Sequence, residues 1–288
     1  MRDLFHEEAG PRIEKPLRAH QSLALDQVRQ SIGIGKKKRP VICLPTGAGK
    51  TRLAAEIVKM ALDKGNAVAF CVPAISLIDQ TVEAFENEGI DRINVIQGQH
   101  PRRDPMARVH VVSVQSLAHR DRPDVRVVIV DECHQQFEVI KRWMQDCPDL
   151  VFVGLSATPW ARGMAEHWDD LLLPVTMQEL IDLGFLSRFR VFAPSHPDLT
   201  AVKITAGDFN EAELSEVMSD NRLVADVVDT WKARARGLPT LVFAVDRAHA
   251  ELLQRQFAEA GVRMGYCDAY VDRIERKVLF DRMAAGDI

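Results

Sequence analysis

The sequence predicts an α/β fold with a parallel sheet covered by helices on both faces, followed by part of a second α/β domain. Two observations predict it. Several short runs are apolar at consecutive positions, so both faces of each strand are expected to be buried, as in a parallel sheet. These runs alternate with amphipathic stretches, the pattern of a doubly wound fold. The length of 288 residues corresponds to about two domains.

The elements of the first domain follow one another in strand–helix order. The strands are expected at residues 41–44, 67–72, 109–114, 125–130 and 150–155. Helices are expected at 51–62 and 75–87, where apolar residues recur at helical spacing. We expect this domain to occupy residues 1–194.

The pattern loosens after about residue 194. Residues 195–220 are rich in turn-forming residues and are expected to connect two domains. A helix is expected at 221–236 because Gly237 and Pro239 follow it as stop signals. Strands at 240–245 and 262–267, each followed by a helix (247–260 and 271–285), then open a second domain over residues 221–288.

Composition excludes several classes of protein. The net charge is −4, and apolar runs are too short for the roughly 20 residues of a membrane-spanning helix. The first eight residues do not resemble a signal peptide. Five cysteines without a CxxC pair argue against a disulfide framework or a zinc module. We therefore expect a cytoplasmic protein with no membrane partner.

The strongest local signal lies between the first strand and the first helix of this pattern. It consists of Pro45, Thr46, Gly47, Ala48, Gly49, Lys50 and Thr51. Glycines let backbone N–H groups surround a phosphate, and the helix that follows directs its positive dipole end at the same anion. Lys50 supplies a charge for the β- and γ-phosphates, and the Thr51 hydroxyl is a ligand for Mg²⁺. This loop predicts a phosphate-bearing nucleotide and Mg²⁺ as ligands.

A second signal is the sequence Asp131-Glu132-Cys133-His134 after the 125–130 strand. The carboxyl end of a parallel strand is where ligands of such sheets bind. Asp131 can hold Mg²⁺, and Glu132 can orient and deprotonate the attacking water. His134 is expected near the γ-phosphate, whereas Cys133 is expected to be a small buried residue.

A third signal is Ser156-Ala157-Thr158 at the end of the 150–155 strand. Such a segment is a common turn, so its value lies in the order of the three motifs. Hydroxyls here could sense whether Asp131 and Glu132 face a γ-phosphate and pass that state to bound nucleic acid.

In this order the motifs resemble those of superfamily-two helicases and translocases, in the DEAD/DEAH-box-like group with a DExH box. The resemblance runs from Leu17 to Ile288 and implies two RecA-like domains. It implies that Arg18 and Gln21 bind ATP, with Gln21 reading adenine. It also implies backbone contacts with nucleic acid at Pro73, Gln80, Ser113 and Gln115.

The resemblance implies a nucleic-acid-dependent ATPase that couples hydrolysis to movement on a strand, with Lys50, Asp131 and Glu132 as catalytic residues. The motifs do not separate DNA from RNA, although we favour DNA. The family's arginine-finger motif does not occur in these 288 residues. We therefore expect a second RecA-like domain that is incomplete, with a further segment or a second polypeptide supplying those arginines. The alternative is a module that binds nucleotide and nucleic acid without hydrolysis.

Overall fold

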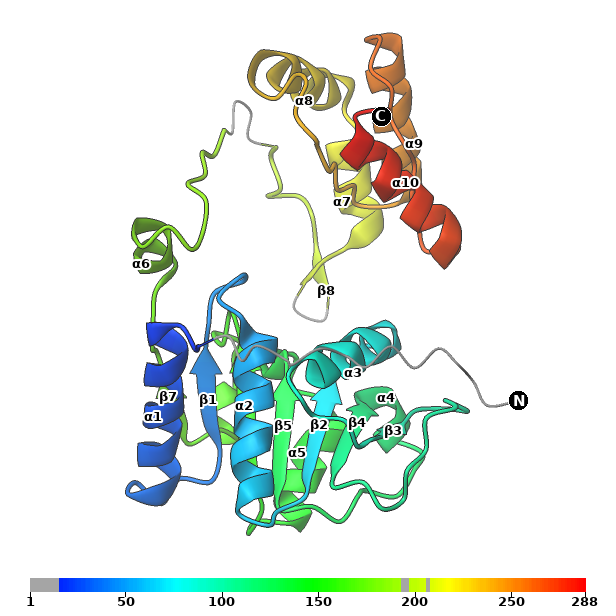
Figure 1. The fold of residues 1–288 in the computed structure, drawn as a ribbon. Coiled ribbons are helices and arrows are strands. Elements are labelled where there is room, and N and C mark those ends of the chain that lie inside the picture. Colours follow the sequence, from blue (N-terminus) through cyan, green and yellow to red (C-terminus); the bar gives the residue numbers. More distant parts are fainter. Residues whose placement is uncertain (1–15, 193–196, 206–207) are drawn as a thin grey trace, which may run out of the picture. The chain divides into compact units, whose positions relative to one another are not determined.

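The computed structural model describes residues 16–192, 197–205 and 208–288 (Figure 1). The chain divides into two compact units, Met1–Arg188 and Phe189–Ile288. The domain boundary expected after residue 194 falls at residues 193–196, outside the described residues.

The first unit contains a seven-stranded sheet in which every neighbouring pair of strands is parallel. The strand order is β3-β4-β2-β5-β6-β1-β7. The strands are β1 (Pro40–Cys43), β2 (Val68–Val72), β3 (Ile93–Ile96), β4 (Val109–Ser113), β5 (Val127–Asp131), β6 (Val151–Ser156) and β7 (Asp170–Leu172). The predicted α/β parallel-sheet fold is confirmed, and β3 and β7 lie at its two edges.

Helices cover both faces of this sheet. They are α1 (Ala19–Gly33), α2 (Lys50–Asp63), α3 (Ile78–Asn87), α4 (Val114–Leu117), α5 (Glu138–Asp146) and α6 (Met177–Asp182). The helix expected at 75–87 begins as a 3₁₀ turn, Ile75–Leu77, before α3.

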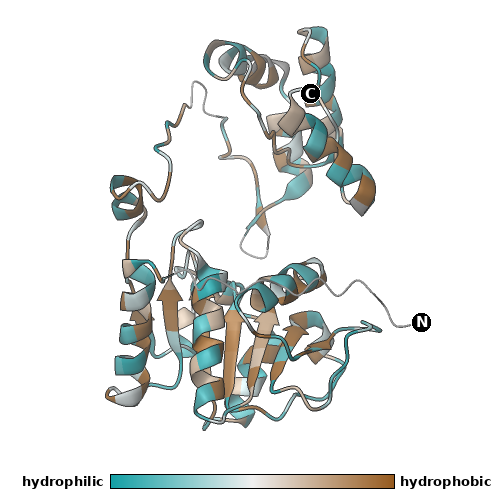
Figure 2. Ribbon diagram, in the orientation of Figure 1, coloured by the Kyte–Doolittle hydropathy of each residue, from teal (hydrophilic) through white to brown (hydrophobic). Residues whose placement is uncertain are grey.

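Alternate residues of each strand enter two separate cores. Along β2, Phe70 packs into the cluster that includes buried residues of α1, α2 and α3. Its neighbours Ala69 and Cys71 pack into the cluster that includes buried residues of α4 and α5. Successive side chains of a strand point to opposite faces, so two apolar cores require strands that are apolar at every position. Figure 2 shows these strands as hydrophobic and the helices as a mixture of hydrophobic and hydrophilic residues.

The second unit is built mainly from helices. It contains an antiparallel pair of strands, β8 (Ile204–Thr205) and β9 (Asp208–Phe209), then α7 (Glu211–Met218), α8 (Asn221–Arg234), α9 (Arg247–Glu259) and α10 (Arg273–Ala285). Its buried core consists of Val224, Val228, Leu253 and Phe257. The helices expected at 221–236, 247–260 and 271–285 correspond to α8, α9 and α10.

The strands expected at 240–245 and 262–267 are not formed. Val242 and Ala244 pack against the core of the second unit, whereas Leu241 and Phe243 are exposed. This alternation is that of a strand, which is why the sequence predicted one. Neither segment pairs with a neighbouring strand in the described part of the chain, however, and a strand is defined by that hydrogen-bonded pairing.

None of the helices in the described ranges combines the length and the apolar composition that crossing a membrane requires.

Candidate functional site

The glycine-rich loop joins β1 to α2 at the carboxyl edge of the sheet. Leu44, which lies between β1 and the first loop residue Pro45, is fully buried and donates its N–H to Ser156 O (3.0 Å), which connects the start of the loop to the end of β6. Gly49 precedes α2 with φ = 88°, in the left-handed region. A Cβ at Gly49 would also collide with the amide nitrogen of Gln21. Both facts require glycine at this position.

Gln21 holds this loop from the side of α1. Its Nε2 donates to Ala48 O and to Gly49 O, each at 3.3 Å, and its Oε1 accepts the N–H of Arg18 (3.0 Å). Gln21 is only 2% exposed. The amide group expected to read adenine is therefore used within the protein to support the phosphate loop.

Two charged residues of the predicted site meet across the sheet edge. Lys50, the first residue of α2, places its Nζ 3.1 Å from Oε1 of Glu132, which follows β5. The two side chains are largely buried, 16% and 30% exposed. The residue expected to bind phosphate and the residue expected to activate water thus form an ion pair.

Glu132 is held in an unusual backbone conformation. Its φ of 48° lies in the left-handed region, which costs a residue with a side chain about 1 kcal/mol or more. The strand ends there, and Glu132 N donates to Asp131 Oδ1 (3.1 Å) before a 3₁₀ turn, Cys133–Gln135, begins. Such strain is found where a side chain must be aimed at a site.

Asp131 lies in an environment that disfavours its charged form. Burial raises the pKa of the Asp131 carboxyl, and the charge of Glu132 raises it further, while Lys50 acts in the opposite direction. A bound cation would remove this penalty. The Asp131 carboxylate is therefore a suitable ligand for a divalent metal ion.

His134 joins the DExH box to the end of β6. Its Nδ1 lies 2.9 Å from Ser156 Oγ and 3.4 Å from Glu132 Oε2. Ser156 is fully buried, and its Oγ also accepts the N–H of Thr158 (3.0 Å). The structure thus brings the second and third predicted motifs into direct contact. Ala157 accepts a hydrogen bond from Cys43 Sγ (3.7 Å), and Thr158 itself is exposed.

The residues expected to contact nucleic acid differ in accessibility. Gln80 and Gln115 are exposed, and Gln115 Nε2 donates to Pro73 O (2.6 Å), linking the ends of β2 and β4. Ser113 is fully buried. Its hydroxyl caps α4 by accepting from Ser116 N (3.2 Å), so it does not reach the surface.

The structure adds three residues that the motifs do not contain. His20 Nε2 lies 2.9 Å from Ala48 O, and the His20 ring meets the Phe185 ring edge-on at 5.7 Å. Phe185 also lies under the Arg18 guanidinium, 4.6 Å from Cζ to the ring centroid. Leu186 packs against Gly47 of the phosphate loop. Phe185 and Leu186 follow α6, far from the motifs in sequence, so no local pattern could have identified them.

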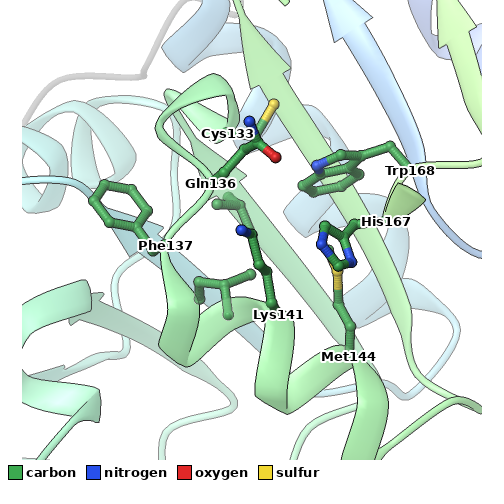
Figure 3. A pocket seen from close by; sticks show the side chains of 9 residues that line it. Cys133, Gln136, Phe137, Lys141, Met144, His167 and Trp168 are labelled. Carbon is green, nitrogen blue, oxygen red and sulfur yellow. The ribbon is translucent and has the colours of Figure 1, made fainter. Parts of the chain in front are cut away.

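A small cavity lies on the α5 side of the DExH box (Figure 3). Its lining includes Cys133, Phe137, Met144 and Trp168, and its volume is about 10 Å³, room for roughly one water. Burial raises the pKa of the Cys133 thiol to about 12, with the charges of Glu132 and Asp131 contributing. Cys133 is therefore a protonated packing residue at neutral pH, and the cavity is not a nucleotide site.

Comparison with known proteins identifies relatives that are longer than this chain. A 51.5 kDa protein of a Lactococcus phage is 25% identical over 249 residues, covering 82% of this chain and 51% of the relative. "Putative ATP-dependent helicase IRC3" of Saccharomyces cerevisiae is 26% identical over 297 aligned residues, covering 94% of this chain and 43% of the relative. The chain thus spans about half the length of these curated relatives. Among solved structures, UvsW of bacteriophage T4 matches with a TM-score of 0.48 and 16% identity, over 94% of this chain and 56% of UvsW.

The resemblance to superfamily-two helicases is confirmed by a family model. The model described as "Type III restriction enzyme, res subunit" matches residues 14–161, which include the phosphate loop, the DExH box and the Ser-Ala-Thr segment. Because this match covers just over half of the residues, the chain belongs to the family of the type III restriction enzyme res subunit.

Proposed function

We propose that this chain is a nucleic-acid-dependent ATPase of the superfamily-two helicase type, which couples ATP hydrolysis to movement on DNA or RNA. The observation that carries the proposal is the chain of contacts from Lys50 through Glu132 and His134 to Ser156. It connects a phosphate loop, a carboxylate base and an exposed surface segment in one site. The family match and the helicase relative support the same activity.

Phosphate binding rests on the loop and the start of α2. Backbone N–H groups of residues 47 and 49–51 surround the phosphates, and the amino end of α2 adds its dipole. The Glu132 carboxylate and the phosphates are anions that compete for the same Lys50 ammonium group. Lys50 therefore leaves Glu132 and binds the β- and γ-phosphates when the nucleotide enters. ATP binding therefore releases Glu132 from its ion pair.

Thr51 and Asp131 would hold Mg²⁺. Hydroxyl and carboxylate oxygens are ligands that Mg²⁺ accepts, and phosphate oxygens and waters complete its octahedral shell. The raised pKa of the Asp131 carboxyl fits this role, because a cation nearby stabilises its charged form. When bound, the ion neutralises charge on the phosphates.

Glu132 acts as the general base once Lys50 has turned to phosphate. A carboxylate next to the γ-phosphate orients a water and accepts its proton. His134, within 3.4 Å of Glu132 Oε2, keeps that carboxylate in place. The bond from His134 to Ser156 then transmits the state of the site to Thr158 at the protein surface.

Nucleic acid is expected along the ends of β2, β3 and β4. Gln80 and Gln115 offer exposed polar groups there. Arg103 and Arg120 both donate to Gly98 O, at 3.1 Å and 2.6 Å, just after β3. The partner of both guanidiniums is this uncharged carbonyl oxygen, and neither forms an ion pair with a carboxylate of the described residues, so their charge is available for phosphates.

We also place this ATPase in the cytoplasm. The five cysteines are free thiols, and Cys43, Cys71 and Cys133 are buried. Unpaired buried thiols are typical of proteins from a reducing compartment.

The test measures ATP turnover with single-stranded DNA, with single-stranded RNA and with neither. Turnover that rises well above the blank with one of them supports the proposal and identifies the nucleic acid. Lys50→Ala is expected to weaken ATP binding roughly tenfold or more, because a charge-assisted contact is lost. Unchanged ATP binding by this variant would contradict the assignment of the phosphate loop. ATP binding without turnover in any of the three conditions would contradict the ATPase and leave a binding module.

A further inference from the structure

Phe185 is fixed in place by the end of α6. The N–H groups of Phe185 and Leu186 both donate to Leu180 O, at 2.9 Å and 3.1 Å. Gly184, with φ = 75°, makes the left-handed turn that ends the helix. Leu180 is itself fully buried in the core under α1 and α2. The ring of Phe185 is thus carried by a rigid segment and does not depend on a loose loop.

This rigid segment lies against the phosphate loop at two points. A Cβ at Gly47 would come within 2.7 Å of Leu186 Cδ2, so the two residues are in close contact. His20 bridges the Phe185 ring and Ala48 O, at 5.7 Å and 2.9 Å respectively. A molecule whose phosphates lie in the loop would therefore have its other end within reach of Phe185.

The face of Phe185 is available for a flat ligand. Residue Phe185 is 41% exposed, and the only cation stacked on its ring among the described residues is the guanidinium of the exposed Arg18. A guanidinium and an aromatic base both bind flat against an aromatic ring. The Arg18 guanidinium therefore marks where a planar ligand would stack on Phe185. Arg18 can move aside and then cover the other face of that ligand.

A buried nitrogen atom of His20, the residue between Phe185 and the loop, has no hydrogen-bond partner among the described residues. Because a carbonyl oxygen only accepts hydrogen bonds, His20 Nε2 carries the proton that Ala48 O receives. His20 Nδ1 is buried and has no hydrogen-bond partner among the described residues. A buried acceptor without a donor is unfavourable, so a ligand or a rearrangement that supplies a donor here is favoured.

We propose that Phe185 is the base-stacking residue of the nucleotide site, with the purine ring held between Phe185 and the Arg18 guanidinium. The proposal rests on the proposed function, because it assumes that the phosphate loop binds a nucleoside triphosphate. It assigns base recognition to Phe185 because both ends of the Gln21 amide are already bonded within the protein. Phe185 is thus a specificity-determining residue of a site whose phosphate half lies in the loop.

The experiment compares two ligands that share phosphates and differ in the base. Equilibrium binding of ATP and of inorganic tripolyphosphate is measured for the wild type, Phe185→Ala and Phe185→Trp. Phe185→Ala is expected to weaken ATP binding about tenfold, the loss expected for one stacked base, and to change tripolyphosphate binding less than about twofold. Phe185→Trp is expected to keep ATP affinity near that of the wild type. Its fluorescence is expected to change with ATP and not with tripolyphosphate.

Phe189→Ala is the matched control, because this phenylalanine, close to Phe185 in sequence, is exposed and is the first residue of the second unit. It is expected to bind both ligands like the wild type. Unchanged ATP affinity in Phe185→Ala would overturn the proposal. An equal loss for both ligands would also overturn it, since Phe185 would then only support the phosphate loop. A wild type that binds neither ligand would instead contradict the proposed function, and this assignment would fall with it.

Discussion

Lys50 Nζ lies 3.1 Å from Glu132 Oε1, so the charge of the proposed phosphate-binding lysine is balanced by that of the proposed general base. The pair joins the first residue of α2 to the residue after β5. The two side chains are largely sheltered from solvent, and a triphosphate offers Lys50 several anionic oxygens in place of one carboxylate. In the proposed function, phosphate binding and release of Glu132 are therefore one event.

Glu132→Gln is expected to separate binding from hydrolysis. Turnover falls by about 10²–10⁴-fold because the general base is lost. ATP affinity stays equal or rises, because Lys50 no longer has a competing carboxylate. Steady-state turnover and equilibrium nucleotide binding check the two parts. Glu138→Gln is the control, since Glu138 also pairs with a lysine, Lys141 at 2.8 Å, but on the exposed face of α5. A large loss of ATP affinity in Glu132→Gln would contradict the proposed competition.

Asp131→Asn is expected to raise the free energy of unfolding at neutral pH. The pKa of Asp131 is raised in the folded protein, first by burial and then by Glu132. Between the ordinary value of 3.8 and the raised value, the folded protein keeps a proton that the unfolded chain has lost. Stability due to this group therefore falls as pH rises through that interval, and it stays low above it.

Asparagine has no charge to bury and can still accept from Glu132 N. The gain in stability over the wild type should thus be absent near pH 3.8 and below, grow as pH rises and level off at neutral pH. Urea denaturation of both proteins across this range measures it. A variant less stable than the wild type at pH 7 would show that the Asp131 charge is stabilised in the folded protein.

Ser156→Ala is expected to destabilise the first unit by about 1–3 kcal/mol, the cost of leaving buried polar groups without a partner. The substitution removes the acceptor of Thr158 N and the partner of His134 Nδ1. Urea denaturation measures the loss. Ser76→Ala, at an exposed position, should change stability by less than about 0.5 kcal/mol. Equal stability of both variants would mean that the Ser156 hydroxyl contributes nothing to the fold.

The strands that could be predicted are those whose side chains pack into both hydrophobic cores, one on each face of the sheet. β2 and β5 are apolar at consecutive positions because α1–α3 cover one face and α4–α5 the other. β3 and β7 lie at the edges of the sheet and have partly exposed residues, so their sequences carry a weaker signal. The strands predicted in the second unit were wrong because alternation indicates an extended segment, while pairing requires a neighbour.

The same distinction applies to the site. The phosphate loop and the DExH box could be predicted because each is a short continuous segment. Its geometry follows from the end of a strand and, for the loop, from the start of the next helix. The burial of Ser113 and the internal bonds of Gln21 depend on tertiary contacts, and neither could be predicted from motif order. Phe185 is the extreme case, because more than 160 residues separate it from Arg18 and only the packing of α6 brings the two together.

The double substitution Arg103→Ala/Arg120→Ala is expected to weaken nucleic-acid binding through electrostatics alone. The two guanidiniums converge on Gly98 O, whereas neighbouring Arg102 is neutralised by Glu86. Each arginine that contacts a phosphate contributes about one to the slope of log affinity against log salt concentration. The slope should therefore fall by about two, equally for strands of different sequence.

Fluorescence anisotropy of a labelled single strand between about 50 and 200 mM salt measures this slope. Arg29→Ala/Arg142→Ala removes the same charge from α1 and α5 and is the matched control. Because those arginines lie within helices and not in the segments that follow β3 and α4, their loss should leave the slope unchanged. If both double variants lowered the slope alike, the effect would come from net charge, and Arg103 and Arg120 would not lie on the path of the strand.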